Sequence, residues 1–111
     1  MGKIVVPNRE ASRVLASILQ CRLKAITHEM GYTLLRTCRS PILNEARDFV
    51  TGLYDDKGHM LEQAEYIPVL AFALQPVCRK IIEYFGEDID PGDIILHNDV
   101  FTGGNQNADV S

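Results

Sequence analysis

The chain has 111 residues, of which 46% are hydrophobic and 23% are charged, a composition typical of one soluble globular domain. Its net charge of −4 and pI near 5.2 argue against nucleic acid as a partner, because phosphate binding relies on clustered Lys and Arg. The sequence holds no apolar run approaching about 18 residues and no recognisable leader, so we expect no membrane span and a cytoplasmic location.

The three cysteines are Cys21, Cys38 and Cys78. They are widely separated and form no Cys-x-x-Cys pair, which favours a reducing cytosol over a disulfide framework. Each lies in an apolar helical context. We therefore interpret them as small buried hydrophobic residues and not as nucleophiles.

A long amphipathic helix is predicted from residue 9 to residue 37, after a short apolar arm that ends at residues 7–8. Its apolar residues recur at three- and four-residue steps, which places them on one helical face. These residues are Val14, Leu15, Ile18, Leu19, Leu23, Ile26, Met30, Leu34 and Leu35. Pro41 ends the helix, because the residue before a proline is pushed out of the helical region.

At about 1.5 Å per residue this helix would be roughly 40 Å long, which is more than a compact domain of this size covers. We expect either a helix of another chain or further sequence of the same subunit to pack along it. The alternative is that Gly31 and the Thr27–His28 step divide the segment into two ordinary helices.

A β-hairpin is predicted at residues 49–64. The β-branched and aromatic run at residues 49–54 is the first strand, and residues 60–64 are the returning strand. Between them, Asp55-Asp56-Lys57-Gly58 forms a turn whose glycine tolerates positive φ. Residues 41–48, before the hairpin, are interpreted as a polar connector.

A second helix is predicted at residues 69–85, with Pro76 kinking or dividing it and Gly86 ending it. Its first half is apolar on nearly every side, which indicates a buried helix. An acidic turn at residues 87–93 follows. The continuous apolar run at residues 94–96 then predicts a short strand buried on both faces, leading into a Gly-Gly loop. The fold class is therefore α+β.

Ligand-type side chains gather in the loop that follows this predicted strand. His97, Asn98 and Asp99 come directly after it, where side chains are held rigidly while reaching a cleft. We predict His97 and Asp99 as catalytic residues, with His97 a proton carrier near neutral pH. Gly103 and Gly104 allow close backbone approach, and their N–H groups are candidates for binding an anion of a cofactor.

The spacing Gln106-x-x-Asp109 could direct an amide oxygen and a carboxylate toward one cation. Oxygen ligands of this kind favour Mg²⁺, Mn²⁺ or Ca²⁺ over Zn²⁺. The alternative is an ordinary turn, since Asn, Asp and Gly are common in turns.

Four ordered motifs resemble the N-terminal part of the hydantoinase B and oxoprolinase family, which includes the larger subunits of acetone and acetophenone carboxylases. The motifs are Glu-Ala-Arg-Asp-Phe at residues 45–49, Leu-Tyr-Asp-Asp-Lys-Gly at 53–58, Gln-Ala-Glu-Tyr-Ile-Pro-Val at 63–69, and Pro-Gly-Asp through Asn-Asp-x-x-x-Gly-Gly at 91–104. The resemblance covers residues 20–111, and it is the order and separation of the motifs that make it specific.

The resemblance implies an ATP-dependent complex in which a partner subunit, similar to hydantoinase A, uses ATP to phosphorylate a ketone or cyclic amide. The present subunit would complete the reaction. Family members often carry Gly-Gly-Thr-His-x-x-Asp, whose His and Asp bind a divalent metal such as manganese, zinc or magnesium. Carried over by position, these ligands fall on Gln106 and Asp109, and Gln is the poorer ligand for a transition metal. The forms Asn-Asp-Val-Phe at residues 98–101 and Gly-Gly-Asn-Gln at residues 103–106 favour the ketone-carboxylase branch.

Family subunits are much longer than this chain, so residues 1–111 are interpreted as a single domain or an N-terminal fragment of a hydantoinase B-like subunit. We expect the fragment to be inactive alone and to belong to a hetero-oligomer. The alternative function is a non-enzymatic α/β module that binds a small ligand or a protein and dimerises through its long helix.

Overall fold

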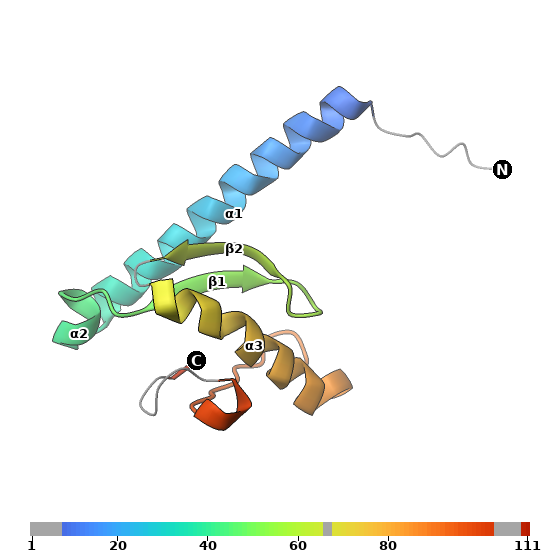
Figure 1. The fold of residues 1–111 in the computed structure, drawn as a ribbon. Coiled ribbons are helices and arrows are strands. Elements are labelled where there is room, and N and C mark those ends of the chain that lie inside the picture. Colours follow the sequence, from blue (N-terminus) through green and yellow to red (C-terminus); the bar gives the residue numbers. More distant parts are fainter. Residues whose placement is uncertain (1–7, 66–67, 104–109) are drawn as a thin grey trace.

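The computed structural model describes residues 8–65, 68–103 and 110–111 (Figure 1). Its helices and strands are α1 (Arg9–Thr37), α2 (Pro41–Asn44), β1 (Val50–Tyr54), β2 (Met60–Glu65) and α3 (Pro68–Phe85), followed by the short 3₁₀ turns η1 (Gly86–Asp88) and η2 (Val100–Thr102). The predicted α+β class, with a long first helix, a hairpin and a second helix, is confirmed.

Helix α1 is one continuous helix of 29 residues, so the alternative of two helices is wrong. It begins after Asn8, whose side-chain oxygen accepts a hydrogen bond from the Glu10 N–H at 3.3 Å. Gly31 does not break it. A glycine costs a helix only about 1 kcal/mol relative to Ala, and Gly31 is buried, unlike most of the helix.

Residues 41–48 are not only a connector, because α2 forms one helical turn there. Pro41 stands at its first position, where a missing N–H costs nothing and the fixed φ favours a helix. Further along, Arg47 adopts a φ of 53°, which is uncommon for a residue other than glycine. The Phe49 N–H then donates to the Arg47 carbonyl at 2.9 Å, so the chain turns tightly just before β1.

Strands β1 and β2 pair antiparallel, with Thr51 opposite Ala64 and Gly52 opposite Gln63, which confirms the predicted hairpin. Asp55 organises its turn by accepting hydrogen bonds from the N–H groups of Lys57 and His59, and from the His59 ring. These bonds, chiefly that from the His59 backbone N–H, lower the pKa of the Asp55 carboxyl.

One face of the hairpin lies against α1. Thr51 is buried there, and its hydroxyl donates to the Thr27 carbonyl of α1 at 2.9 Å. Thr27 is 0% exposed, and Gly31, one helical turn later, is also buried. Small side chains on both elements therefore let the helix cross the strands at close range.

The other face of the hairpin lies against α3. The Tyr54 ring covers Gly52, where an added Cβ would come 2.8 Å from the Tyr54 Cε2 atom. Burial raises the pKa of Tyr54 to about 12, and the charge of Cys78 on α3 adds to the shift. At the turn, Gly58 packs against Arg79 and Ile82 of α3. The hairpin is thus the middle layer between two helices (Figure 1).

Helix α3 is less buried than its composition predicted. Phe72 is 82% exposed, and among its described side chains only Val77 is fully buried, at 1% exposure. The two strands of the hairpin cover one side of the helix and leave the rest open. Pro76 does not divide the helix, although its missing N–H leaves the Phe72 carbonyl without a helical donor.

The predicted buried strand at residues 94–96 is wrong. These residues are extended but belong to no strand, and Ile94 and Leu96 are 88% and 78% exposed. The backbone pairs only from the next residue, where His97 and Ser111 exchange two N–H to carbonyl bonds of 2.9 and 2.7 Å. An apolar run alone does not specify a sheet partner, and none lies beside this run among the described residues.

The molecule is elongated, with extents of 56 × 32 × 24 Å. Its radius of gyration of 17.1 Å exceeds the roughly 13 Å of a compact chain of this length. The first half of α1 projects beyond the hairpin (Figure 1) and leaves Val14, Leu15, Ile18 and Leu19 more than half exposed.

Cys21 is exposed as well, which corrects its interpretation as a buried residue. No helix of the described chain is long and apolar enough to cross a membrane.

The buried contact between α3 and the hairpin predicts how stability responds to truncation. Val77→Ala removes two methyl groups from a fully buried site, so we expect the free energy of unfolding to fall by roughly 1–3 kcal/mol. Val14→Ala makes the same chemical change on a helix side chain that is 56% exposed, and should change it by less than about 0.5 kcal/mol. Urea unfolding followed by circular dichroism measures both. Equal losses would contradict this description of the core.

Candidate functional site

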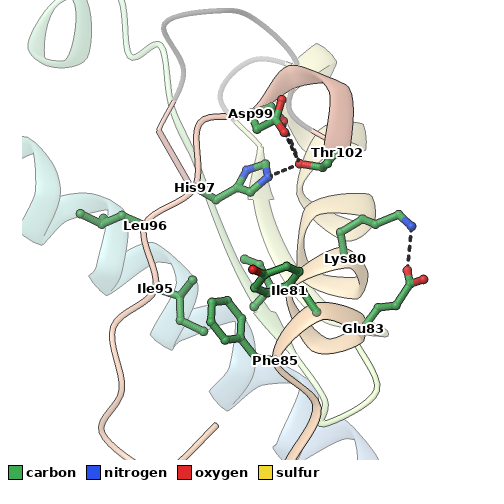
Figure 2. Close-up of a pocket in the computed structure, with 10 residues that line it drawn as sticks. Lys80, Ile81, Glu83, Phe85, Ile95, Leu96, His97, Asp99 and Thr102 are labelled. Carbon is green, nitrogen blue, oxygen red and sulfur yellow. Dashed lines mark hydrogen bonds and ion pairs between the residues drawn. The ribbon is translucent and has the colours of Figure 1, made fainter. Parts of the chain in front are cut away.

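A pocket of about 640 Å³ lies between the second half of α3 and the extended segment that leads to η2 (Figure 2). A volume of this size is ordinary for a small-molecule site. Its lining residues are Lys80, Ile81, Glu83, Tyr84, Phe85, Ile95, Leu96, His97, Asp99 and Thr102. Both walls are fixed by backbone structure, one by a helix and the other by the pairing of His97 with Ser111.

The pocket combines an apolar side with a few polar groups. Ile81, Phe85 and Ile95 supply the apolar side, and the ring of Phe85 stacks edge to face on Tyr84 with 5.0 Å between ring centroids. Lys80 and Glu83 form a 2.7 Å ion pair on the exposed surface of α3 (Figure 2). An apolar wall with few convergent polar groups is typical of pockets that bind small organic molecules.

The polar end of the pocket is a chain of three side chains (Figure 2). The Thr102 hydroxyl lies 2.9 Å from His97 Nε2 and 3.1 Å from Asp99 Oδ2. The other carboxylate oxygen of Asp99, Oδ1, accepts a hydrogen bond from the Phe101 N–H at 2.9 Å, which caps η2. The turn of the backbone therefore brings Asp99 and Thr102 together, and Thr102 joins them to His97.

Gly103 holds this turn against α3. It adopts a φ of 119°, a region that residues with a side chain rarely occupy. An added Cβ would lie 3.1 Å from the Val77 nitrogen and 3.2 Å from the Pro76 carbonyl carbon. A glycine is required here both for the backbone conformation and for the close approach of two backbones.

The structure brings two of the predicted site residues, His97 and Asp99, into one pocket with Thr102 between them. Gly103 lies beside them. Gly104, Gln106 and Asp109 fall outside the described residues, so the predicted metal and anion sites remain predictions. Within the described ranges, no group of three or more His, Cys, Asp and Glu side chains is placed to hold a metal ion.

The sequence reasoning missed Thr102 and the contribution of α3. The Asp-x-x-Thr spacing of residues 99–102 was a usable signal, because Asp and Thr at this separation commonly cap a turn by side-chain hydrogen bonds. No comparable signal marks Lys80, Tyr84 or Phe85 as neighbours of His97. That proximity follows from how α3 packs on the hairpin.

The three side chains do not form a nucleophile–base–acid triad. In such a triad the carboxylate binds the far nitrogen of the imidazole, whereas here Asp99 binds the Thr102 hydroxyl. Thr102 is therefore not arranged as an activated nucleophile. Cys78 is no better a candidate, since burial raises the pKa of its thiol and disfavours the reactive thiolate.

Comparison with known proteins identifies relatives across nearly the whole chain. The sequence profile of a family described as Hydantoinase B/oxoprolinase matches residues 12–111. The beta subunit of caprolactamase from Pseudomonas jessenii is 33% identical over 86 residues, which are 78% of this chain and 15% of that protein. 5-Oxoprolinase 1 from Arabidopsis thaliana is 31% identical over 101 residues, which are 91% of this chain and 8% of that protein.

A third relative is a D-/L-hydantoinase subunit of the B type from Pseudomonas sp. strain NS671. It is 27% identical over an alignment of 114 positions, gaps included, which covers 99% of this chain and 19% of that protein. The chain thus spans less than a fifth of the length of each of these relatives. No solved structure matches it.

The close approach of Gly103 to α3 predicts that adding a methyl group at this position lowers the free energy of unfolding. Gly103→Ala must strain the backbone and also press against Pro76 and Val77, whereas Gly92→Ala, at a φ of 102° with nothing within 4 Å, only strains the backbone. We expect Gly103→Ala to lower the free energy of unfolding by about 1 kcal/mol or more beyond the loss in Gly92→Ala. Urea unfolding of both variants checks this. Equal losses would mean that the η2 turn does not pack on α3 as described.

Proposed function

Since this chain belongs to the hydantoinase B/oxoprolinase family, we propose that it is the N-terminal portion of a subunit that hydrolyses cyclic amides in an ATP-dependent complex in the cytoplasm. The observation that carries the proposal is the match along residues 12–111 to relatives named for caprolactam, 5-oxoproline and hydantoin. All three compounds are small rings with an amide in the ring. We take that shared group as the substrate class.

Ring-amide hydrolysis is favoured over ketone carboxylation. The carboxylase alternative rests on the forms of residues 98–101 and 103–106. In the first of these, Asp99 caps η2 and Phe101 is 95% exposed. None of the relatives described above is named as a carboxylase. Ketone carboxylation therefore stands second.

The pocket supports the proposal in chemical terms. A small ring amide has an apolar carbon ring and a polar edge, which suits a pocket with Ile81, Phe85 and Ile95 on one side and His97 with Asp99 on the other. In this function His97 transfers protons to or from the substrate. Gln106 and Asp109 would supply oxygen ligands for a divalent cation, a donor set that suits magnesium or manganese.

A second polypeptide is part of the proposal. The relatives from Pseudomonas are named as subunits, and we propose that an ATP-binding subunit of the hydantoinase A type activates the substrate. Exposed apolar side chains on α1 and on residues 94–101 support an assembly with further protein surface. The chain by itself supplies one part of the site and is expected to be inactive.

A second candidate is a non-enzymatic module that dimerises through α1. The observation in its favour is the half-exposed apolar row Val14, Leu15, Ile18 and Leu19 on the projecting half of that helix. Light scattering separates the two candidates. A discrete dimer that captures no ATP-binding subunit would favour the module.

The expected activity of the isolated chain is testable. With ATP, magnesium and caprolactam, 5-oxoproline or hydantoin, the purified chain should release no phosphate above the protein-free blank. Added to a hydantoinase A-type subunit, it should co-elute with that subunit in gel filtration. Malachite-green detection of phosphate and the elution profile are the measurements. Amide-dependent phosphate release by the chain alone would refute its dependence on a partner.

A further inference from the structure

The contacts among Asp99, Thr102 and His97 determine which nitrogen of the His97 ring carries the proton. Thr102 Oγ1 lies within hydrogen-bond distance of both His97 Nε2, at 2.9 Å, and Asp99 Oδ2, at 3.1 Å. A threonine hydroxyl has a single proton to donate, and its oxygen can accept. It therefore donates to one of these neighbours and accepts from the other.

The carboxylate decides between the two arrangements. Near the Thr102 hydroxyl, Asp99 offers two oxygens that only accept hydrogen bonds, the ionised carboxylate Oδ2 at 3.1 Å and the backbone carbonyl at 3.4 Å, so the hydroxyl must donate to Asp99. The remaining lone pair of the Thr102 oxygen then accepts from His97 Nε2–H. The reverse arrangement would leave two acceptors, Asp99 Oδ2 and Thr102 Oγ1, facing each other at 3.1 Å without a proton between them.

The other ring nitrogen is left with a lone pair and no partner. His97 Nδ1 is buried, and no described residue offers it a hydrogen bond. A buried acceptor without a donor is unfavourable, because it has lost water without replacing it. The ring itself lines the pocket, and Nδ1 is its one nitrogen without a hydrogen-bond partner among the described residues, so it is the acceptor that a donor on a bound molecule would satisfy.

We infer that Asp99, acting through Thr102, fixes His97 in the Nε2–H tautomer, and that Nδ1 accepts the amide N–H of a small cyclic amide bound in the pocket. Asp99 and Thr102 are positioning residues in this arrangement. The tautomer stands on the contacts alone, whereas the role of Nδ1 rests on the proposed function.

The surrounding backbone keeps the arrangement in place. Asp99 is oriented by the Phe101 N–H, and η2 is held to α3 by the close approach of Gly103. His97 is fixed on its other side by the paired backbone bonds to Ser111. The ring is thus restrained both at its backbone and at Nε2, and Nδ1 remains its nitrogen without a hydrogen-bond partner in the described parts of the chain.

His59 in the hairpin turn serves as an internal reference, because its contacts favour the opposite tautomer. His59 Nδ1 lies 2.9 Å from Asp55 Oδ2, and this carboxylate also must accept. His59 is therefore in the Nδ1–H tautomer, while His97 is in the Nε2–H tautomer. The two rings should differ in the same spectrum under the same conditions.

The test is two-dimensional ¹H–¹⁵N spectroscopy of the full chain with ¹⁵N-labelled histidine, at a pH where the rings are neutral. The chain has three histidines, and His97→Gln and His59→Gln assign their signals. We expect the unprotonated nitrogen to be Nδ1 in His97 and Nε2 in His59. A protonated Nδ1 in His97 overturns the inference, whatever the activity of the larger complex.

Variants of Thr102 test the positioning role. Thr102→Val keeps the shape but removes the hydroxyl, so the His97 signals should move toward a mixture of both tautomers while those of His59 stay unchanged. Thr102→Ser retains the hydroxyl and should restore the single Nε2–H form. If Thr102→Val leaves His97 in one tautomer, Asp99 does not act through Thr102.

Caprolactam and N-methylcaprolactam test the role of Nδ1 without any turnover. Only caprolactam carries an amide N–H, so it should shift the His97 Nδ1 resonance in a saturable way, and N-methylcaprolactam should not. Equal shifts from both compounds, or none from either, overturn Nδ1 as the acceptor. Such a failure is distinct from failure of the proposed function, which would show as absence of cyclic-amide hydrolysis by the assembled complex.

Discussion

Helix α1 crosses the hairpin at close range, and this contact stabilises the two strands against which the other elements pack. A two-stranded sheet is at best marginally stable in water by itself, and it becomes stable when helices cover it. Thr27 and Gly31 place only small side chains on the face of α1 that meets the strands. The Thr51 hydroxyl donates a hydrogen bond across this interface to the Thr27 carbonyl at 2.9 Å. The bond satisfies a buried hydroxyl and fixes where along its length the helix meets the strands.

Helix α3 packs on the opposite face of the same two strands and thereby positions the pocket. Tyr54 covers Gly52 on that face, and Gly58 at the turn packs on Arg79 of α3. The backbone of α3 at Pro76 and Val77 then forms the surface against which Gly103 packs. The positions of His97 and Asp99 thus depend on how α3 packs on the hairpin. A shift of α3 should therefore move these two pocket residues.

The apolar surface left open agrees with the coverage of the relatives. Phe49, Ala64 and Val77 are the buried apolar side chains of the described residues, whereas Ile94, Leu96 and Phe101 are largely exposed. The chain spans less than a fifth of the relatives described above. A small core with large exposed side chains beside a pocket is what one part of a larger folded subunit shows.

The order of amino acids is enough to predict the local elements and the family. Apolar periodicity predicted the long helix, the β-branched and aromatic run at residues 49–54 with the Asp-Asp-Lys-Gly turn predicted the hairpin, and ordered motifs indicated the hydantoinase B/oxoprolinase assignment. These signals are local, because helix period and turn chemistry depend on neighbouring residues. The tertiary structure alone decided that residues 94–96 form no strand, that α3 is half-open, and that Thr102 links Asp99 to His97. Each of these depends on what lies opposite in space, and a single sequence does not specify its partner across the fold.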